Sequence, residues 1–328
     1  MVWQRVQTWL GMRPPVLALT LVNQEVRYVV RQGTRVLAQG YCAAPEAFKE
    51  GRLVAPERLA RALLPLLPSR KGGAGQVAVL LPTQCLQLHE VSLPVGLDAE
   101  ELSYQMGRYI THTLALTQEE VFYDWAIQET GAEKRVMTVL LAVARQSEVA
   151  PFHQMFVDSD WRLKWVCPEP QVWSLAYQSR AMVDRPVAVC RIEFDGVAFW
   201  LIESDGRVRS FYHVVTEQEF SRVGFVYQSG SASSPDAWVR FPTRFVGDML
   251  EQYLSTWLGQ QAWRDLNVVY VTGKGVNWSE AIGSLQARFG LPFRLAEEAL
   301  TAGQMASPSV QPLNGLAALW LLAGQVDL

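Results

Sequence analysis

The feature that most constrains the fold is a strand pattern that occurs twice along the chain. Each half opens with three runs of apolar and β-branched residues separated by short polar turns, and a helix and a further strand follow. The runs are Val16–Val22, Glu25–Arg31 and Arg35–Gly40, then Val187–Glu193, Val197–Ser204 and Val208–Val215. The letters themselves do not repeat. The pattern predicts two α/β lobes of one architecture, although two unrelated α/β domains would also fit it.

Composition narrows the class of protein. At about 150 residues per domain, 328 residues indicate two domains, and 49% apolar with 19% charged residues indicates a folded chain. The net charge of −3 argues against a nucleic-acid-binding protein, because such domains carry a basic excess. The cysteines lack CxxC spacing and are typical of a reducing compartment; they are Cys42, Cys85, Cys167 and Cys190.

The apolar segments are too short to cross a membrane. The longest, Leu316–Ala323, is less than half of the ~20 residues that a bilayer requires. Residues 1–12 form an amphipathic helical pattern with two tryptophans, which would suit either a membrane surface or the body of the protein. Arg5 is its only charge, which favours the second alternative. We expect a cytoplasmic protein.

A capped helix is predicted in the first half, within a group of three strands. Asp98 precedes Ala99–His112, and acidic residues follow it in the first turn. Its apolar stripe consists of Leu102, Met106, Tyr109 and Ile110. Tyr104 lies off this stripe, and Arg108 is a polar neighbour one turn later. We therefore predict that Tyr104 and Arg108 contact a partner rather than support the fold.

The span from Val77 to Arg180 resembles the PilM class of type IV pilus assembly proteins. The matching stretches are VAVLLP, HEVSLPVGLDAEEL, GRYITHTLALTQEEVFYDWAI, VLLAVARQSEVAPF and WVCPEPQVWSLAY. The resemblance implies an actin-like α/β fold of the FtsA type with two lobes. The first lobe, 1–185, would hold subdomain 1A with an inserted subdomain 1C at about 91–150. The second, 186–328, would hold subdomain 2A with a reduced 2B at about 214–262.

The same resemblance implies three phosphate-binding turns, and their key residues are altered here. In the first turn, Thr20, Val22 and Arg27 stand where the class has Asp, Gly and Lys, with Asn23 between them. The second reads Glu193, Asp195 and Gly196 with a disturbed glycine spacing, and the third keeps Gly273, Lys274 and Gly275. Each lost charge-assisted contact costs roughly 1.5–3 kcal/mol, so we expect no ATP or Mg²⁺ cofactor and no catalysis.

The other residues that could bind a metal ion or act as a nucleophile are dispersed along the sequence. Cys85 and His89 lie four apart on a predicted strand, roughly 13 Å, which is too far for one metal ion. Cys167 has no histidine near it in sequence that could act as its base.

These observations favour a non-catalytic scaffold. The resemblance implies binding of the N-terminal tail of a PilN-type inner-membrane protein, in a groove between 1A and 1C, with pilus motor ATPases as possible further partners. Membrane association would then be indirect, on the cytoplasmic face of the inner membrane. A nucleotide-switched actin-like ATPase of the same machine is the alternative, and a division-type filament protein is a third.

Overall fold

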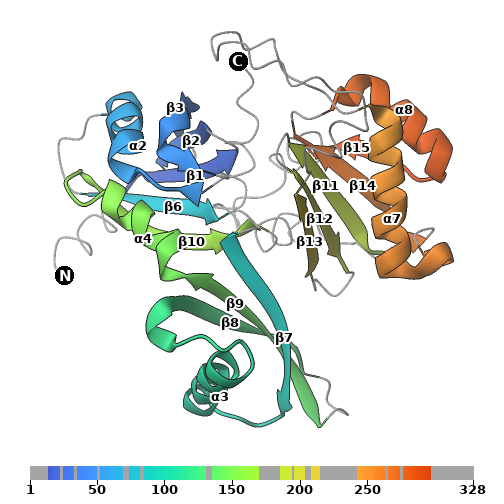
Figure 1. The fold of residues 1–328 in the computed structure, drawn as a ribbon, viewed down its shortest axis with the longest axis horizontal. Helices are drawn as coiled ribbons and strands as arrows, with labels where there is room; N and C mark the ends of the chain where they lie inside the picture. The colour runs from blue at the N-terminus through green and yellow to red at the C-terminus, as the bar shows by residue number, and fades with distance from the viewer. Residues whose placement is uncertain are drawn as a thin grey trace. The chain divides into compact units, whose positions relative to one another are not determined.

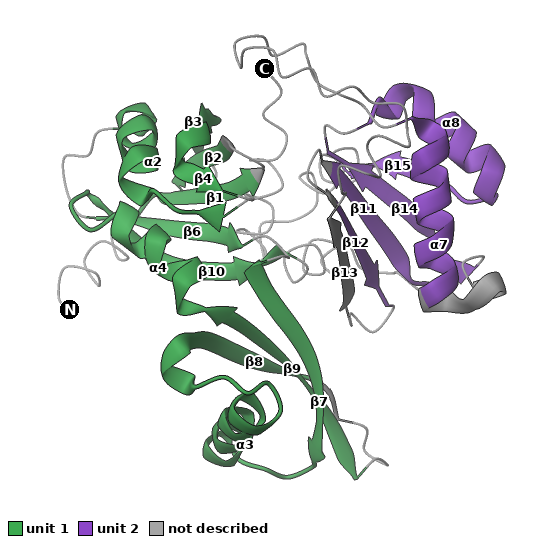
Figure 2. Ribbon diagram, in the orientation of Figure 1, with its two compact units in different colours: residues 1–169, 322–328 green, residues 170–321 purple. Residues whose placement is uncertain are grey.

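The computed structural model describes most of the chain as two compact units, coloured separately in Figure 2. The first holds the described residues up to Glu169, and the second those from Arg185 onward. The described ranges are 14–22, 25–32, 35–49, 52–68, 74–81, 85–130, 135–169, 185–193, 196–203, 208–214, 242–262, 265–273 and 276–296. The helices expected within 1–12, 170–179 and 313–322, and the glycine- and serine-rich stretch 228–237, lie outside them. The expected lobe boundary at 185/186 stays a prediction.

The first unit is built on a five-stranded sheet with the order β10-β6-β1-β2-β3. Its first three strands are β1 (Val16–Val22), β2 (Glu25–Gln32) and β3 (Arg35–Ala43), which form an antiparallel meander. The strands β6 (Gly75–Leu81) and β10 (Trp161–Pro168) then extend the sheet in parallel beyond β1.

The second unit repeats this plan. Its sheet has the order β13-β12-β11-β14-β15, with the same antiparallel meander and the same two parallel strands. The strands are β11 (Val187–Glu193), β12 (Gly196–Ile202), β13 (Val208–Val214), β14 (Val268–Thr272) and β15 (Phe293–Leu295). The helices are α7 (Thr243–Ala262) and α8 (Trp278–Phe289). The predicted architectural repeat is therefore confirmed, whereas the three-residue β15 was not predicted because it is too short to show a period.

An α/β subdomain is inserted in the first unit between β6 and β10 (Figure 1). Its sheet has the order β7-β9-β8, formed by β7 (Leu86–Pro94), β8 (Val121–Thr130) and β9 (Val136–Arg145). The helix α3 (Ala99–His112) and the single turn η4 (Gln118–Glu120) connect β7 to β8. We call this group, residues 86–145, subdomain 1C. It overlaps the expected region, about 91–150, but begins earlier, because the whole of β7 pairs with β9.

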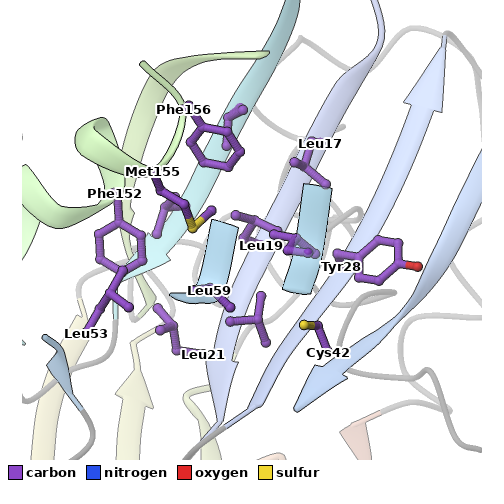
Figure 3. Packing of buried hydrophobic residues seen from close by; sticks show 14 of the residues in the cluster. Leu17, Leu19, Leu21, Tyr28, Cys42, Leu53, Leu59, Phe152, Met155 and Phe156 are labelled. Atoms are coloured by element: carbon purple, nitrogen blue, oxygen red, sulfur yellow. The ribbon is translucent and has the colours of Figure 1, made fainter. Parts of the chain in front are cut away.

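The core of the first unit lies on one face of its five-stranded sheet. Figure 3 shows Leu17, Leu19 and Leu21 of β1 pointing to the same side as Phe152 and Met155. The last two belong to α4 (Gln146–Met155), which follows β9. The helix α2 (Pro56–Leu63) packs on the same side through Leu59 and Leu63. The break expected near Pro65 is confirmed, since α2 gives way to the 3₁₀ turn η2 (Leu64–Leu66).

Three short elements of the first unit were also not predicted from the sequence. They are η1 (Pro45–Ala47) and the two-residue strands β4 (Phe48–Lys49) and β5 (Arg52–Leu53), which pair with each other before α2. Such short pairs depend on the core beneath them rather than on a local pattern, and Phe48 and Leu53 are both buried in that core.

Candidate functional site

Helix α3 begins where the sequence predicts and is firmly capped. The Asp98 carboxylate accepts hydrogen bonds from the backbone N–H groups of Glu100 and Glu101, both at 2.9 Å. The Glu101 carboxylate in turn accepts from the backbone N–H of Asp98, which completes a capping box. A helix fixed at its start presents each later side chain at a defined angle.

The two sides of α3 differ sharply in burial. Leu102, Met106 and Ile110 are buried against the 1C sheet together with Val91, Val121, Val139 and Leu141. Tyr104, by contrast, is 65% exposed, the largest exposed fraction among the large apolar residues that the structure describes. The expectation that the stripe packs and Tyr104 does not is confirmed.

Tyr104 and Arg108 line one open hollow on subdomain 1C. The hollow has a volume of about 400 Å³. Its walls come from α3, η4 and β8; they are Glu100, Ser103, Tyr104, Gly107, Arg108, Thr111, His112, Gln118 and Tyr123. The resemblance implied a groove between 1A and 1C, but this hollow is lined by 1C residues alone.

A glycine shapes the floor of the hollow. Gly107 is buried in the third turn of α3, and a Cβ added there would meet only the side-chain amide of Gln118. Within the described structure, that amide forms no hydrogen bond to another residue. The glycine is thus not needed for a close backbone contact, and the Gln118 amide takes the place that a side chain at this position would fill.

The hollow carries a cation, the guanidinium of Arg108. Arg108 is exposed and forms no ion pair with any other residue that the structure describes. Glu100 is the carboxylate among the lining residues, and His112 is the other basic group. A polar guanidinium beside an exposed aromatic ring is a common arrangement for fixing a peptide, because one group gives orientation and the other gives contact area.

The wall of 1C behind α3 is structural. The His89 ring on β7 lies 5.7 Å from the Tyr109 ring, centroid to centroid, and burial lowers the pKa of His89. Burial thus favours the uncharged imidazole, which suits its packing against the Tyr109 ring.

Two of the residues that correspond to the first phosphate-binding turn of the PilM class pair with each other across neighbouring strands. Thr20 on β1 and Arg27 on β2 are directly opposite each other, and Thr20 also aligns with Leu80 on β6. Both Thr20 and Arg27 are buried, at 5% and 6% exposure. Val22 ends β1 opposite Glu25, while Asn23 lies outside the described residues.

The matched residues of the second unit fall mainly at turns. Glu193 ends β11 and pairs with Gly196 at the start of β12; Asp195 between them, like Lys274 and Gly275, lies outside the described residues. Gly273 has φ +102°, and a Cβ there would collide with the backbone of Ile192. Its carbonyl accepts a 2.8 Å hydrogen bond from Trp278 Nε1. Packing alone therefore explains why this position is glycine.

The cysteines are not arranged as nucleophiles. Burial, aided by the charge of Asp124, raises the pKa of Cys167 to about 12. Burial also raises the pKa of Cys85 to about 12, with a further contribution from Glu148. Both thiols are therefore protonated at neutral pH and poorly reactive. Among the described residues, no group of His, Cys, Asp and Glu is placed to hold a metal ion.

Comparison with known proteins reveals similarity of structure. No family model and no curated protein sequence matches the chain. A chain of the PilM–PilN type IV pilus biogenesis complex superposes with a TM-score of 0.66 and 16% identity, over 94% of this chain and 97% of that one. Together with the duplicated strand order of the two sheets, this decides the architecture. The chain has the actin-like fold.

Two further structures align with lower scores. One is a Bacteroides thetaiotaomicron protein with an actin-like ATPase fold, at TM-score 0.44 and 11% identity over 88% of this chain and 93% of that one. The other is the cytoplasmic domain of EpsL, an inner-membrane component of the Vibrio cholerae type II secretion system, at TM-score 0.42 and 13% identity over 96% of each chain. In the described part of this chain, no helix is both long and apolar enough to span a bilayer.

Sequence reasoning named two of the hollow's residues and missed the others. Gly107 and Gln118 meet across a turn, and Tyr123 reaches the hollow from β8. The sequence does hold one signal near these residues, the capping-box pattern of Thr117 and Glu120. This pattern fixes the start of η4, which carries Gln118.

Proposed function

We propose that this protein is a non-catalytic scaffold of a type IV pilus or related secretion platform, acting at the cytoplasmic face of the inner membrane. It binds the N-terminal cytoplasmic tail of a PilN-type bitopic membrane protein and reaches the membrane through that partner. The fold likeness to a chain of the PilM–PilN complex supports the class of machine. The observation that carries the proposal is the meeting in one hollow of an exposed Tyr104 and an exposed Arg108 that forms no ion pair with another described residue.

The chemistry of the hollow suits a peptide better than a small molecule. It is open, with an aromatic ring, a guanidinium and hydroxyl and amide groups along its walls. Small-molecule sites enclose most of their ligand in an apolar cavity, whereas peptides are fixed by one or two anchors and a polar rim.

The absence of catalysis is also part of the proposal. Thr20 supplies no carboxylate for Mg²⁺, and the Arg27 guanidinium is buried rather than presented to solvent. The glycine retained in the third turn is required by the backbone of Ile192. Losing two or three charge-assisted contacts would weaken nucleotide binding by ~4–8 kcal/mol, roughly 10³- to 10⁶-fold.

The test is calorimetry with a synthetic peptide of the N-terminal cytoplasmic tail of a PilN-type protein. We expect Tyr104→Ala and Arg108→Ala each to weaken binding roughly tenfold, about 1.4 kcal/mol. Because both side chains are exposed, the melting temperature should stay within a few degrees of the wild type. Tyr41→Ala and Arg35→Ala are matched controls, since both residues are exposed on β3. Normal binding by both hollow variants would place the site elsewhere.

A further inference from the structure

We propose that the free edge of β8 is a strand-addition site, at which an extended basic segment pairs with β8 and places one apolar side chain in the hollow beside Tyr104. The proposal rests on the proposed function for the identity of the partner. It adds how the partner binds and what chemistry its sequence must have. In strand addition, main-chain hydrogen bonds supply affinity and alternate side chains supply specificity.

The first observation is the position of β8 in its sheet. Among the described strands, β8 pairs with β9 alone and forms one edge of the order β7-β9-β8. The backbone N–H of Trp125 donates a 2.8 Å hydrogen bond to the Asp124 carboxylate rather than to β9. This N–H therefore points to the free edge. Because the pattern alternates, the N–H and C=O groups of Tyr123 and Trp125 face outward, while those of Phe122 and Asp124 face β9.

The second observation is that this edge borders the hollow. Tyr123 contributes its side chain to the wall of the hollow and lies opposite Val143 of β9. A strand added beside Tyr123 would direct every second side chain to the α3 side of the sheet, where Tyr104 and Gly107 lie. Its other side chains would lie beside Phe122, which is 51% exposed on the opposite face. One peptide can thus use both the edge and the hollow.

The third observation is charge. Residues 118–130 contain Glu119, Glu120, Asp124 and Glu129 and no lysine or arginine. The first three are exposed. A second copy of β8 would bring these carboxylates together, and like charges on paired strands are destabilising. A basic segment would be attracted instead. Cytoplasmic segments next to a membrane-spanning helix are enriched in lysine and arginine, so the tail of a bitopic protein has the matching chemistry.

Asp124 gives the edge a specific role in recognition. Its carboxylate occupies the outward N–H of Trp125 in the free protein and protects the edge from pairing with other strands. An incoming carbonyl must replace it at that N–H. The released carboxylate then remains beside the added strand as an acceptor for a lysine or arginine. The exchange favours basic segments over neutral or acidic ones.

The direct test is amide hydrogen exchange by NMR on the whole protein, with and without a short synthetic peptide in which lysine alternates with leucine. We expect new protection at the amides of Tyr123 and Trp125. The amides of Phe122 and Asp124, already bonded to β9, should change little. The same peptide with glutamate in place of lysine should give no protection. Uniform protection of β8, or protection confined to α3, would overturn strand addition.

A second test separates main-chain pairing from charge. Methylating alternate backbone nitrogens of the lysine–leucine peptide should abolish binding when they face β8, whereas methylation of the other set should not. Asp124→Lys should weaken binding more than tenfold, and Asp158→Lys, an equal charge change at an exposed position after α4, should weaken it less than twofold. Protection of Tyr123 and Trp125 without any peptide, growing with protein concentration, would assign the edge to a second copy and refute the proposal.

The tail peptide distinguishes the two proposals. If the tail binds and Tyr104→Ala weakens it, but methylated and unmethylated peptides bind alike, the scaffold function stands and strand addition fails. If neither the tail nor the lysine–leucine peptide binds, both proposals fail.

Discussion

Gly107 offers a prediction in which stability and binding move in opposite directions. It lies inside α3, away from both ends, and has no positive φ, so alanine can adopt its conformation. Glycine within a helix is less favourable than alanine by ~0.8–1.0 kcal/mol. The added methyl group would meet only the end of the Gln118 side chain, which is exposed and can rotate away. Gly107→Ala should therefore stabilise the protein by about 0.5–1 kcal/mol.

The same methyl group, and the displaced Gln118 amide, would occupy the floor of the hollow. We expect tail binding to weaken at least threefold while the melting temperature rises by roughly 1–3 °C, from the usual scaling for domains of this size. Differential scanning fluorimetry and calorimetry on one preparation would measure both quantities.

A double variant isolates the cause. When Gly107→Ala is added to Gln118→Ala, no side-chain amide has to move. The free energy of unfolding should therefore rise by the full helix-propensity difference, about 1 kcal/mol, relative to Gln118→Ala alone. Destabilisation of the single variant by more than about 1 kcal/mol would show that Gln118 is rigidly packed and that the glycine is structural. Unchanged tail binding in the stabilised variant would remove the hollow from the binding site.

Three further predictions concern nucleotide, the glycine turn and pH. Calorimetry with millimolar ATP and Mg²⁺ should give no binding heat, whereas saturation at micromolar ATP would refute the scaffold proposal. Gly273→Ala should destabilise the second unit by more than ~2 kcal/mol in denaturant unfolding, because φ is +102° and the methyl group would meet the Ile192 backbone. An unchanged midpoint would mean that this turn relaxes easily. Burial raises the pKa of Cys85 to about 12, whereas the thiol of an unfolded chain has a pKa of about 8.5. The protonated thiol therefore contributes fully to the free energy of unfolding below about pH 8.5, and this contribution declines as the pH rises toward 12. The slope from this thiol should approach ~1.4 kcal/mol per pH unit, and Cys85→Ala should remove that part of the slope.

The sequence by itself determined the elements with a clear local period. The two meanders could be predicted because their strands, seven to nine residues long, are separated by short polar turns. Helix α3 could be predicted because Asp98 and Glu101 form its cap locally. The exposure of Tyr104 followed from its place off the apolar stripe, since a capped helix fixes the angle of every side chain. These properties depend on neighbours within a few residues along the chain.

Tertiary structure decided what lies together across longer distances. The pairing of Gly107 with Gln118, the arrival of Tyr123 from β8 at the hollow, and the status of β8 as an edge strand all depend on how the 1C strands are ordered. No local pattern encodes the order β7-β9-β8, because it places β9 between two strands that precede it in the chain. The same holds for Gly273. Its sequence context is equally consistent with a nucleotide-binding turn, and only the structure shows that the backbone of Ile192, on another strand, requires glycine there.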